Sequence, residues 1–432
     1  MQANPERPVP FRDAVLFWLK LGFINFGGPT GQIAIMHDEL VERRRWIGNE
    51  RFLHALNYCM LLPGPEAQQL AVYVGWLLHR TIGGLVAGIF FILPGFALML
   101  ALSWLRVAHG DVAWVAGVFG GVRAAVIAIV AAAVIRIGSK ALKRKSLVAL
   151  AVTAFVAIFL LKVPFPAIVI GAGALGFLHR ARGGSATPAT DAARPSVKRA
   201  VLVALIGLAV WWGPLMGVRA WRGKDDVLSR EAVFFSQAAM VTFGGAYAVL
   251  AYMNQAAVER YRWLEPGEML DGLGLAESTP GPLIMVTEYV GFIGAYRHAN
   301  DLPPLAAGIL GALVATWATF APCFLWIFLG APFVERLRGR PRLDAALSGI
   351  TAAVVGVIAS LAVWFSIHTL FREVGEARLL GLTLPSPAVS SLDPFAIVVA
   401  AASFYVLWRR RWGVIPVVGA SAAAGLLDRF VF

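Results

Sequence analysis

The sequence FGGPTGQIAIMHDELVERRRW at residues 26–46, together with PGPE at residues 63–66, decides the fold, because both stretches return later in the chain. Residues 243–263 read FGGAYAVLAYMNQAAVERYRW, and residues 280–282 repeat PGP, each 217 positions further on without a gap. Trp and Pro are uncommon residues, so one offset that aligns them indicates an internal duplication. Both copies keep helix-breaking sequence inside apolar sequence, which in a membrane protein is typical of a transport site between two halves.

Composition places the chain in the membrane. Of its 432 residues 59% are hydrophobic, and the mean hydropathy is +0.71. Residues 82–105, 112–135, 305–329 and 345–367 each exceed the roughly 20 apolar residues that a helix needs to cross a bilayer. A β-barrel would show short alternating segments instead. We therefore expect an all-α polytopic membrane protein.

The net charge of +13 does not indicate a nucleic-acid partner. Basic residues gather in loops at 140–145, 336–342 and 409–411, as expected of cytoplasmic flanks under the positive-inside rule. The two cysteines, Cys59 and Cys323, form neither a disulfide framework nor a metal-ligand pattern. The first apolar segment belongs to the repeat, so we do not interpret it as a removable signal peptide.

The chain divides into two repeats and a connection. We predict an N-terminal repeat over 11–179, a flexible cytoplasmic linker over 180–199, a connecting transmembrane helix over 200–218 and a C-terminal repeat over 229–432. The linker is rich in Gly, Ser, Ala, Thr, Pro and Arg.

Loop charge predicts the topology of the repeats. The basic loops fall at non-equivalent places in the two halves, so we expect the halves to be inverted relative to each other. We expect discontinuous helices and about 10–13 transmembrane segments in the whole chain. The number depends on whether the Pro-Gly-Pro segments cross the bilayer or re-enter it.

The broken helices are the candidate anion site. A break inside a membrane helix frees backbone amides, which is tolerated only where protein or a water-filled cavity surrounds it. A helix that restarts there presents N–H groups and its positive dipole end to an anion. The alternative is that the glycines serve helix packing and the prolines only kink. The candidate substrate-binding residues are Asn25, Gly27, Gly28, Gln32, Pro63, Gly64, Pro65, Glu66, Gln68, Arg123, Thr242, Gly244, Gly245, Glu277, Ser278, Thr279, Pro280, Gly281 and Pro282.

Charged residues near the breaks each allow two interpretations. Arg123 lies deep in an apolar segment, where it either contacts the anion or pairs with Glu66 or another carboxylate. Lys20 is expected to extend to the interface. The basic stretches 43–46 and 260–263 are either interfacial anchors or a basic mouth that concentrates anions.

Sites for metals, cofactors and catalysis are not expected. His37, beside two carboxylates, has no second convergent ligand set, so we predict no metal site. The sequence has no phosphate-binding loop and no His-Glu-x-x-His motif, so we predict neither an enzyme nor a cofactor.

Phe26-Gly27-Gly28-Pro29, Arg45-Trp46 and Pro63-Gly64-Pro65, with their partners in the second half, resemble the chromate ion transporter family in its long, two-domain form. The resemblance covers essentially the whole chain. It implies a many-helix protein with opposed halves that exports chromate across the bacterial inner membrane and confers chromate resistance, with sulfate as a structural analogue. The second half departs from the first, with Ala246 in place of Pro29 and no acid after Pro282 to match Glu66. We therefore rank residues of the first half above those of the second as candidates for substrate binding.

Several functions remain open at this point. The first is chromate efflux driven by the membrane potential or by a proton gradient, with Glu66 or Glu277 as proton carrier. Transport of sulfate or another oxyanion, including uptake, is the second. A channel is a further alternative, as is a membrane enzyme acting on an anionic lipid through Glu277 or Glu288. Beyond the anion and the lipid bilayer, a second copy in a homodimer is a further candidate partner.

Overall fold

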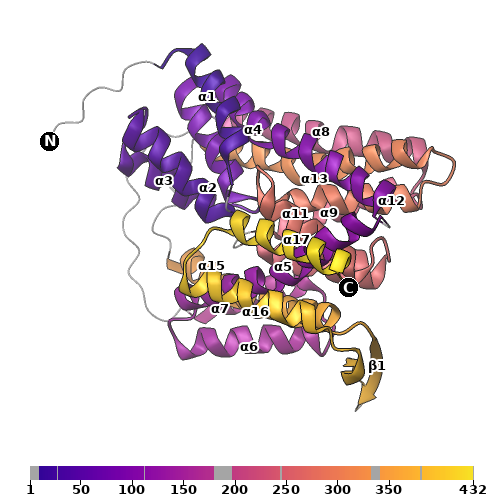
Figure 1. Cartoon of the computed structure of the whole chain (residues 1–432). Helices are drawn as coiled ribbons and strands as arrows, with labels where there is room; N and C mark the ends of the chain where they lie inside the picture. Colours follow the sequence, from indigo (N-terminus) through magenta and orange to yellow (C-terminus); the bar gives the residue numbers. More distant parts are fainter. Residues whose placement is uncertain are drawn as a thin grey trace. The chain divides into compact units, whose positions relative to one another are not determined.

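The computed structural model describes residues 9–26, 28–110, 112–179, 197–243, 246–331, 341–379 and 382–431 (Figure 1). Helices make up nearly all of this part of the chain, which confirms the all-α prediction. The chain forms two compact units, and each combines segments of both repeats. Unit 1 comprises Met1–Ala101, Thr187–Ala246 and Thr279–Gly339, and unit 2 comprises Leu102–Ala186, Tyr247–Ser278 and Arg340–Phe432. These units do not test the predicted boundaries of the repeats and the linker, which stay a prediction. Residues 180–196 of the linker lie outside the described residues.

Unit 1 begins with the broken helices of the first repeat. The chain leaves α1 at Asn25, where the backbone is no longer helical, and restarts a helix at Gly28. That helix ends in a π-helical stretch, η1, whose counterpart η3 lies in the second repeat. The elements are α1 (Phe11–Ile24), α2 (Gly28–His37), η1 (Asp38–Arg43), α3 (Asn49–Cys59) and α4 (Glu66–His109), whose residues 102–109 belong to unit 2.

The long element α4 is a helical hairpin and not one straight rod. His79 and Arg80 have non-helical backbone angles, with φ of +54° at Arg80. The backbones of Gly75 and Gly83 touch, although eight residues of straight helix would separate them by about 12 Å. The two arms therefore span 66–78 and 81–109, and the second arm contains the predicted crossing at 82–105.

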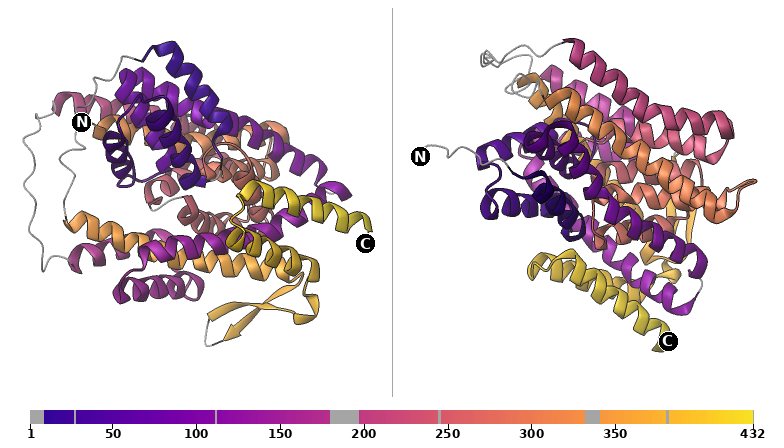
Figure 2. Two further views of the ribbon diagram at one scale, coloured as in Figure 1. Left: turned by 60° about the vertical axis from the view of Figure 1, so that its left-hand side comes forward. Right: turned by 90° about the horizontal axis from the view of Figure 1, so that it is seen from above.

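The second repeat contributes a matching hairpin to unit 1. The first helix, α12, and the second, α13, meet where Gly291 lies against the backbone of Gly311. Small residues at such a crossing let two membrane helices approach closely. Helix α13 also packs on α8 and α9, visible as adjacent ribbons in Figure 2. The elements are α8 (Val197–Arg222), α9 (Val227–Val241), η4 (Leu283–Met285), α12 (Val286–Arg297) and α13 (Pro304–Gly330).

Unit 2 is centred on α5 and α15. Helix α5 contacts α11, α15, α16 and α17, while α15 contacts α6 and α7. Gly121 and Gly425 permit the close approach of α5 and α17. The helices are α5 (Ala113–Ala141), α6 (Lys145–Phe159), α7 (Phe165–His179), α10 (Ala246–Met253), η3 (Asn254–Arg260), α11 (Pro266–Ser278), α15 (Pro341–Leu370), η6 (Val389–Ser391), α16 (Pro394–Arg409) and α17 (Val414–Val431).

A β-hairpin joins α15 to α16, in a place where the sequence analysis predicted no strand. Strands β1 (Val374–Leu379) and β2 (Leu382–Pro387) pair antiparallel, with Leu379 opposite Leu382. The hairpin projects away from the neighbouring helices in Figures 1 and 2. Strand β2 reads LTLPSP, and six such residues are too few to distinguish a strand from a loop by pattern.

Helix lengths agree with a polytopic membrane protein. Within the described residues, five helical elements are long and apolar enough to cross a bilayer: 66–109, which includes the reversal at 79–80, 113–141, 197–222, 304–330 and 345–370. They cover the predicted connecting helix at 200–218 and the four predicted windows, of which 112–135 begins one residue before its helix. Only 11% of the most apolar stretch of α8 is buried inside the protein, so this helix presents its apolar face to lipid.

A polar cluster fastens the ends of the helices in unit 1. Arg222, at the end of α8, binds Asp226 at 3.1 Å and also Asp301 in the α12–α13 connection. Asp226 in turn caps α9 by accepting from the Leu228 amide at 2.9 Å. The Arg222 guanidinium holds the pKa of Asp301 below its usual range.

The Gly291–Gly311 crossing predicts a specific packing defect. A Cβ at residue 291 would lie 2.6 Å from the Gly311 carbonyl oxygen, so Gly291→Leu should destabilise unit 1 by about 1–3 kcal/mol. Gly213→Leu is the control, because a Cβ there meets nothing within 4 Å. Thermal unfolding in detergent measures both, and equal melting temperatures would contradict the close packing.

The Arg222–Asp301 pair predicts a pH dependence of stability. A carboxylate with a lowered pKa contributes stability above its unfolded-state pKa of about 3.9 and loses it as the pH falls through the folded-state value. The melting temperature of the wild type should therefore approach that of Asp301→Asn as the pH is lowered below about 4. A pH-independent difference between the two proteins would show that the pair has no such role. Asp225→Asn, on an exposed carboxylate 4.0 Å from Arg230, is the control.

Candidate functional site

Two backbone hydrogen bonds join the repeats inside unit 1. The Gly64 amide donates to the Thr242 carbonyl oxygen at 2.8 Å, and the Gly281 amide donates to the Asn25 carbonyl oxygen at 3.0 Å. The 217-residue offset relates Gly64 to Gly281 and Asn25 to Thr242. The Pro-Gly-Pro turn of each repeat is thus bonded to the helix break of the other. We call these four residues and the polar side chains around them the crossed-break site.

Both turns need glycine at their centre. Gly64 has a φ of +123° and Gly281 of +109°, a region that residues with a Cβ rarely adopt. A Cβ on Gly64 would also stand 2.9 Å from Cys323 Sγ, and one on Gly281 would stand 3.3 Å from the Cα of Gly95. Cys323 and Gly95 each follow a proline inside a long helix of the opposite repeat. The packing is therefore crossed in the same way as the hydrogen bonds.

Side-chain amides reinforce the crossed-break site. Gln32 Nε2 donates to the Gly281 carbonyl oxygen at 2.5 Å, and Gln69 Nε2 donates to the Pro63 carbonyl oxygen at 2.7 Å. Thr242 Oγ1 donates to the Ala238 carbonyl oxygen and so closes the end of α9. These bonds satisfy the carbonyl groups that the breaks free, which an apolar environment requires.

Several polar atoms at this site remain unsatisfied. Asn25 and Gln68 have no exposed surface, and neither atom of either side-chain amide has a hydrogen-bond partner among the described residues. The same holds for Glu66 Oε2 and for the side-chain oxygens of Gln32 and Gln69. Each buried unsatisfied group costs about 1–3 kcal/mol, so such a cluster is unusual in a folded interior. The amide groups of Asn25 and Gln68 can donate to an anion.

The start of α4 adds backbone donors to the site. Helix α4 begins at Glu66, directly after the Pro-Gly-Pro turn, and Gln68 stands in its first turn. The Gln69 amide is already bonded to the Pro65 carbonyl oxygen, and the Glu66 amide interacts with the carboxylate of its own residue, so the amides of Ala67 and Gln68 remain as the orphan donors of this helix start. Together with the helix dipole they favour a negative charge.

Most of the predicted binding residues belong to unit 1, namely Asn25, Gln32, Pro63, Gly64, Pro65, Glu66, Gln68, Thr242, Thr279, Pro280, Gly281 and Pro282. Hydrogen bonds join Asn25, Gln32 and Gly281 in one group, and Pro63, Gly64, Gln69 and Thr242 in a second. Gly28, with a φ of +66°, starts α2 beside them. Gly27, Gly244 and Gly245 lie outside the described residues. Arg123, Glu277 and Ser278 belong to unit 2.

Arg123 forms an ion pair in unit 2. Its guanidinium donates to both oxygens of Asp271, at 2.5 and 2.7 Å, and Arg106 binds the same carboxylate at 2.9 Å. Asp271 is fully buried, and Glu268 lies 3.9 Å from Arg106. Of the two roles left open for Arg123, the structure has the carboxylate pair, with Asp271 as partner in place of Glu66. No local pattern marks Asp271, because the two residues are 148 positions apart.

The other predicted residues of unit 2 have partners of their own. Glu277 is buried and accepts a hydrogen bond from the Tyr247 hydroxyl. Ser278 Oγ donates to the Gly274 carbonyl oxygen at 2.9 Å, within its own helix. Glu277 therefore differs from Glu66, which keeps an unsatisfied oxygen.

The basic stretch after α2 neutralises a buried carboxylate. Arg43 and Arg44 bind Glu39 at 3.2 and 3.3 Å, and Lys20, with 54% of its side chain exposed, approaches it to 3.8 Å. The Arg44 guanidinium also lies 4.9 Å from the centre of the Trp46 ring. These contacts favour the anchor interpretation of residues 43–46 over a free basic mouth.

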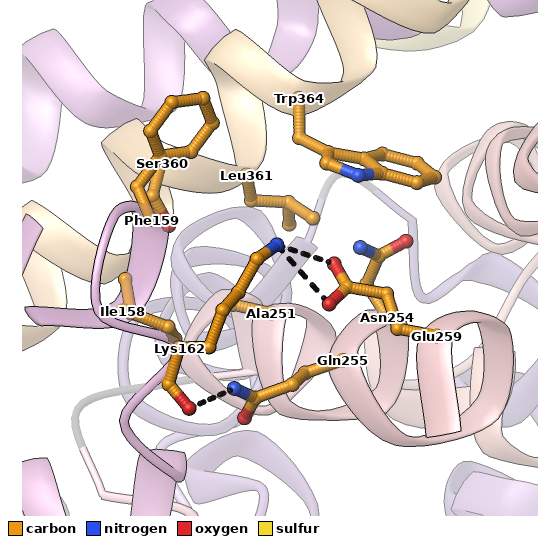
Figure 3. A pocket seen from close by; sticks show the side chains of 10 residues that line it. All are labelled: Ile158, Phe159, Lys162, Ala251, Asn254, Gln255, Glu259, Ser360, Leu361 and Trp364. Atoms are coloured by element: carbon orange, nitrogen blue, oxygen red, sulfur yellow. Dashed lines mark hydrogen bonds and ion pairs between the residues drawn. The ribbon is translucent and has the colours of Figure 1, made fainter. Parts of the chain in front are cut away.

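A pocket in unit 2 was not indicated by the sequence (Figure 3). It is an open hollow between the α6–α7 connection, η3 and α15, with about 330 Å³ of empty space that includes open solvent. Lys162 Nζ reaches into it and pairs with Glu259 at 3.2 Å, beneath the ring of Trp364. The carboxylate neutralises the lysine, so the pocket offers an anion no net positive charge. Within the described residues, no group of three or more His, Cys, Asp or Glu side chains is arranged to hold a metal ion.

The buried Asp271 predicts a large loss of stability when it is removed. Asp271→Asn should cost about 3 kcal/mol, since it leaves two arginines without their carboxylate. Glu259→Gln, which breaks the exposed Lys162 pair, should cost less than about 1 kcal/mol. Thermal unfolding of both variants checks this. The double variant Arg123→Met with Asp271→Leu should recover part of the loss, because Arg106 keeps Glu268 at 3.9 Å, and no recovery would contradict a structural role for the pair.

The chain matches the chromate transporter family over residues 12–177 and 231–426. It is 34% identical to the chromate transport protein of Pseudomonas aeruginosa, over 97% of this chain and 93% of that protein. A chromate transport protein of Cupriavidus metallidurans is 34% identical over 80% of both chains, and a probable chromate transport protein of Synechococcus elongatus is 29% identical over 91% of this chain and 95% of its own length. No solved structure matches.

The family match spans both repeats, and these relatives are named as transport proteins. Together with the apolar helices, this makes the chain a multi-pass integral membrane protein, which in bacteria resides in the inner membrane. The chain therefore belongs to the chromate transporter family.

Proposed function

We propose that the chain carries chromate out of the cell and binds it at the crossed-break site. Chromate is a tetrahedral oxyanion with two negative charges. The proposal rests on one observation: the side-chain amides of Asn25 and Gln68 are buried without hydrogen-bond partners among the described residues. They lie beside the helix breaks that the crossed backbone hydrogen bonds stabilise. The names of the relatives support chromate as the substrate.

Neutral donors suit a transporter better than a fixed cation does. A desolvated dianion needs several hydrogen bonds, and each bond to a charged group contributes about 1.5–3 kcal/mol. The side-chain amides of Asn25 and Gln68 and the first amides of α4 supply such donors. Lysine or arginine at this place would hold the anion more tightly and slow its release. The arginines of unit 2 are instead committed to Asp271.

The membrane potential supplies a driving force for export. Moving one charge through 100 mV corresponds to about 2.3 kcal/mol, so a dianion leaving a cell that is negative inside gains about 4.6 kcal/mol. At about 1.4 kcal/mol for each factor of ten, this supports outward accumulation of roughly 10³-fold. Efflux of this size needs no ATP.

Sulfate should compete for the same site. Sulfate shares the shape and charge of chromate. Hydrogen-bond donors arranged around a tetrahedral dianion recognise mainly this shape and this charge. A site of this kind distinguishes the two mainly by size. We therefore propose sulfate as a second ligand of the crossed-break site.

Flux measurements on purified protein test the proposal. Wild-type protein in liposomes with an imposed potential should give saturable chromate flux that excess sulfate inhibits. Asn25→Leu and Gln68→Leu should each lower kcat/KM at least about tenfold, because each removes a hydrogen bond to a charged ligand. Gln237→Leu, on an exposed position of α9, is the control. Saturable flux that both variants leave unchanged would place the site elsewhere, and no flux from folded wild type would exclude chromate as the substrate.

A further inference from the structure

A further carboxylate without hydrogen-bond partners among the described residues lies in unit 1, on the helix that follows the second Pro-Gly-Pro turn. Glu288 stands in the first turn of α12, has no exposed surface, and neither of its oxygens has a hydrogen-bond partner among the described residues. The 217-residue offset places Ala71 at the equivalent position of the first repeat, and Ala71 is equally buried. The shared fold therefore requires only a methyl group here. The carboxylate of Glu288 is an addition that the scaffold does not need.

The surroundings of Glu288 do not neutralise it. The elements that pack most extensively against α12 are η4, α9 and α13. Their charged or titratable groups are Arg230 and Glu231 on α9 and Cys323 on α13, and α12 itself carries Tyr289, Tyr296 and Arg297. No described residue donates a hydrogen bond to the Glu288 carboxylate. Burying an ionised carboxylate without a partner costs several kcal/mol, so Glu288 holds a proton while it is buried as it is here and releases that proton where solvent reaches it.

The position of Glu288 links it to the anion. Helix α12 follows the Pro280-Gly281-Pro282 turn through the single turn η4, so Glu288 lies on the helix that this turn starts. A dianion at the crossed-break site and an ionised Glu288 would repel each other across a medium of low dielectric constant. Binding of the anion therefore favours the protonated carboxyl, and by linkage protonation favours binding of the anion.

We propose that Glu288 is a proton-binding site that takes up one proton with each oxyanion and releases it when the anion leaves. This proposal rests on the proposed function. The carboxylate gains a proton from the solution on the side where the anion enters and returns it on the other side, so proton and charge balance in each cycle. The net charge moved is then one negative charge in place of two. A pH gradient consequently contributes to the distribution of the anion.

Equilibrium accumulation of labelled chromate in proteoliposomes tests this stoichiometry. The measurement is made in alkaline medium, where chromate is the dianion. At 59 mV a transporter that moves one net charge distributes its substrate about 10-fold, and one that moves two charges about 100-fold. The wild type should give about 10-fold and should shift by a further factor of about ten for each unit of pH difference. Glu288→Gln should give about 100-fold and no shift with pH.

Two variants make the result specific. Glu231→Gln removes another buried carboxylate with no partner among the described residues, on α9, and should keep the wild-type ratio and pH shift. Glu288→Ala, which installs the residue of the first repeat, should behave as Glu288→Gln does. Exchange of internal for external chromate needs no net proton movement and should persist in both Glu288 variants, which shows that they are folded.

Three outcomes would overturn the proposal. The first is a wild-type ratio of about 100-fold without pH dependence, and the second is a Glu288→Gln protein that keeps the wild-type pH shift. The third is a loss of the pH shift in Glu66→Gln or Glu231→Gln in place of Glu288→Gln, since this result assigns the proton to another carboxylate. Absence of chromate exchange in the wild type would instead contradict the proposed function itself.

Discussion

The structure of unit 1 depends on a reciprocal pair of backbone hydrogen bonds, Gly64 to Thr242 and Gly281 to Asn25. A break in a membrane helix leaves carbonyl and amide groups that lipid cannot satisfy. Here each repeat satisfies the groups freed in the other, because the turn of one supplies the donor for the break of its partner. One repeat alone would leave both the amide of its turn and the carbonyl of its break without these bonds. This gives a physical reason why the two helix-breaking motifs recur together.

The duplication preserved the backbone and let the side chains diverge. At equivalent positions, Gln32, Glu66 and Gln68 of the first repeat correspond to Val249, Leu283 and Met285 of the second. The crossed-break site therefore combines the backbone of both repeats with polar side chains taken mainly from the first. The second repeat instead gained Glu288 where the first has Ala71. In our proposals, anion binding and proton binding are divided between the repeats along this line.

Sequence reasoning recovered the features that follow from local chemistry. The predicted breaks at Gly27-Gly28 and Pro63-Gly64-Pro65 and the apolar spans follow from glycine, proline and hydropathy patterns, and the first break begins at Asn25 in the structure. The reversal of α4 at His79 and Arg80 was missed, because neither residue is a turn former and the sequence on both sides is helical. For Arg123 the sequence predicted a carboxylate partner but did not identify Asp271. Residues so far apart in the chain are brought together only by tertiary packing. The β-hairpin was too short to give a periodic signal.

The most direct test of the account is a structure determined with chromate bound, in which the anomalous scattering of chromium locates the ion. We expect a single chromium position within hydrogen-bonding distance of the side-chain amides of Asn25 and Gln68. The crossed bonds of Gly64 and Gly281 should be intact around it. A chromium peak beside Arg123, with Asp271 displaced from the guanidinium, would contradict the account and move the site to the arginines of unit 2.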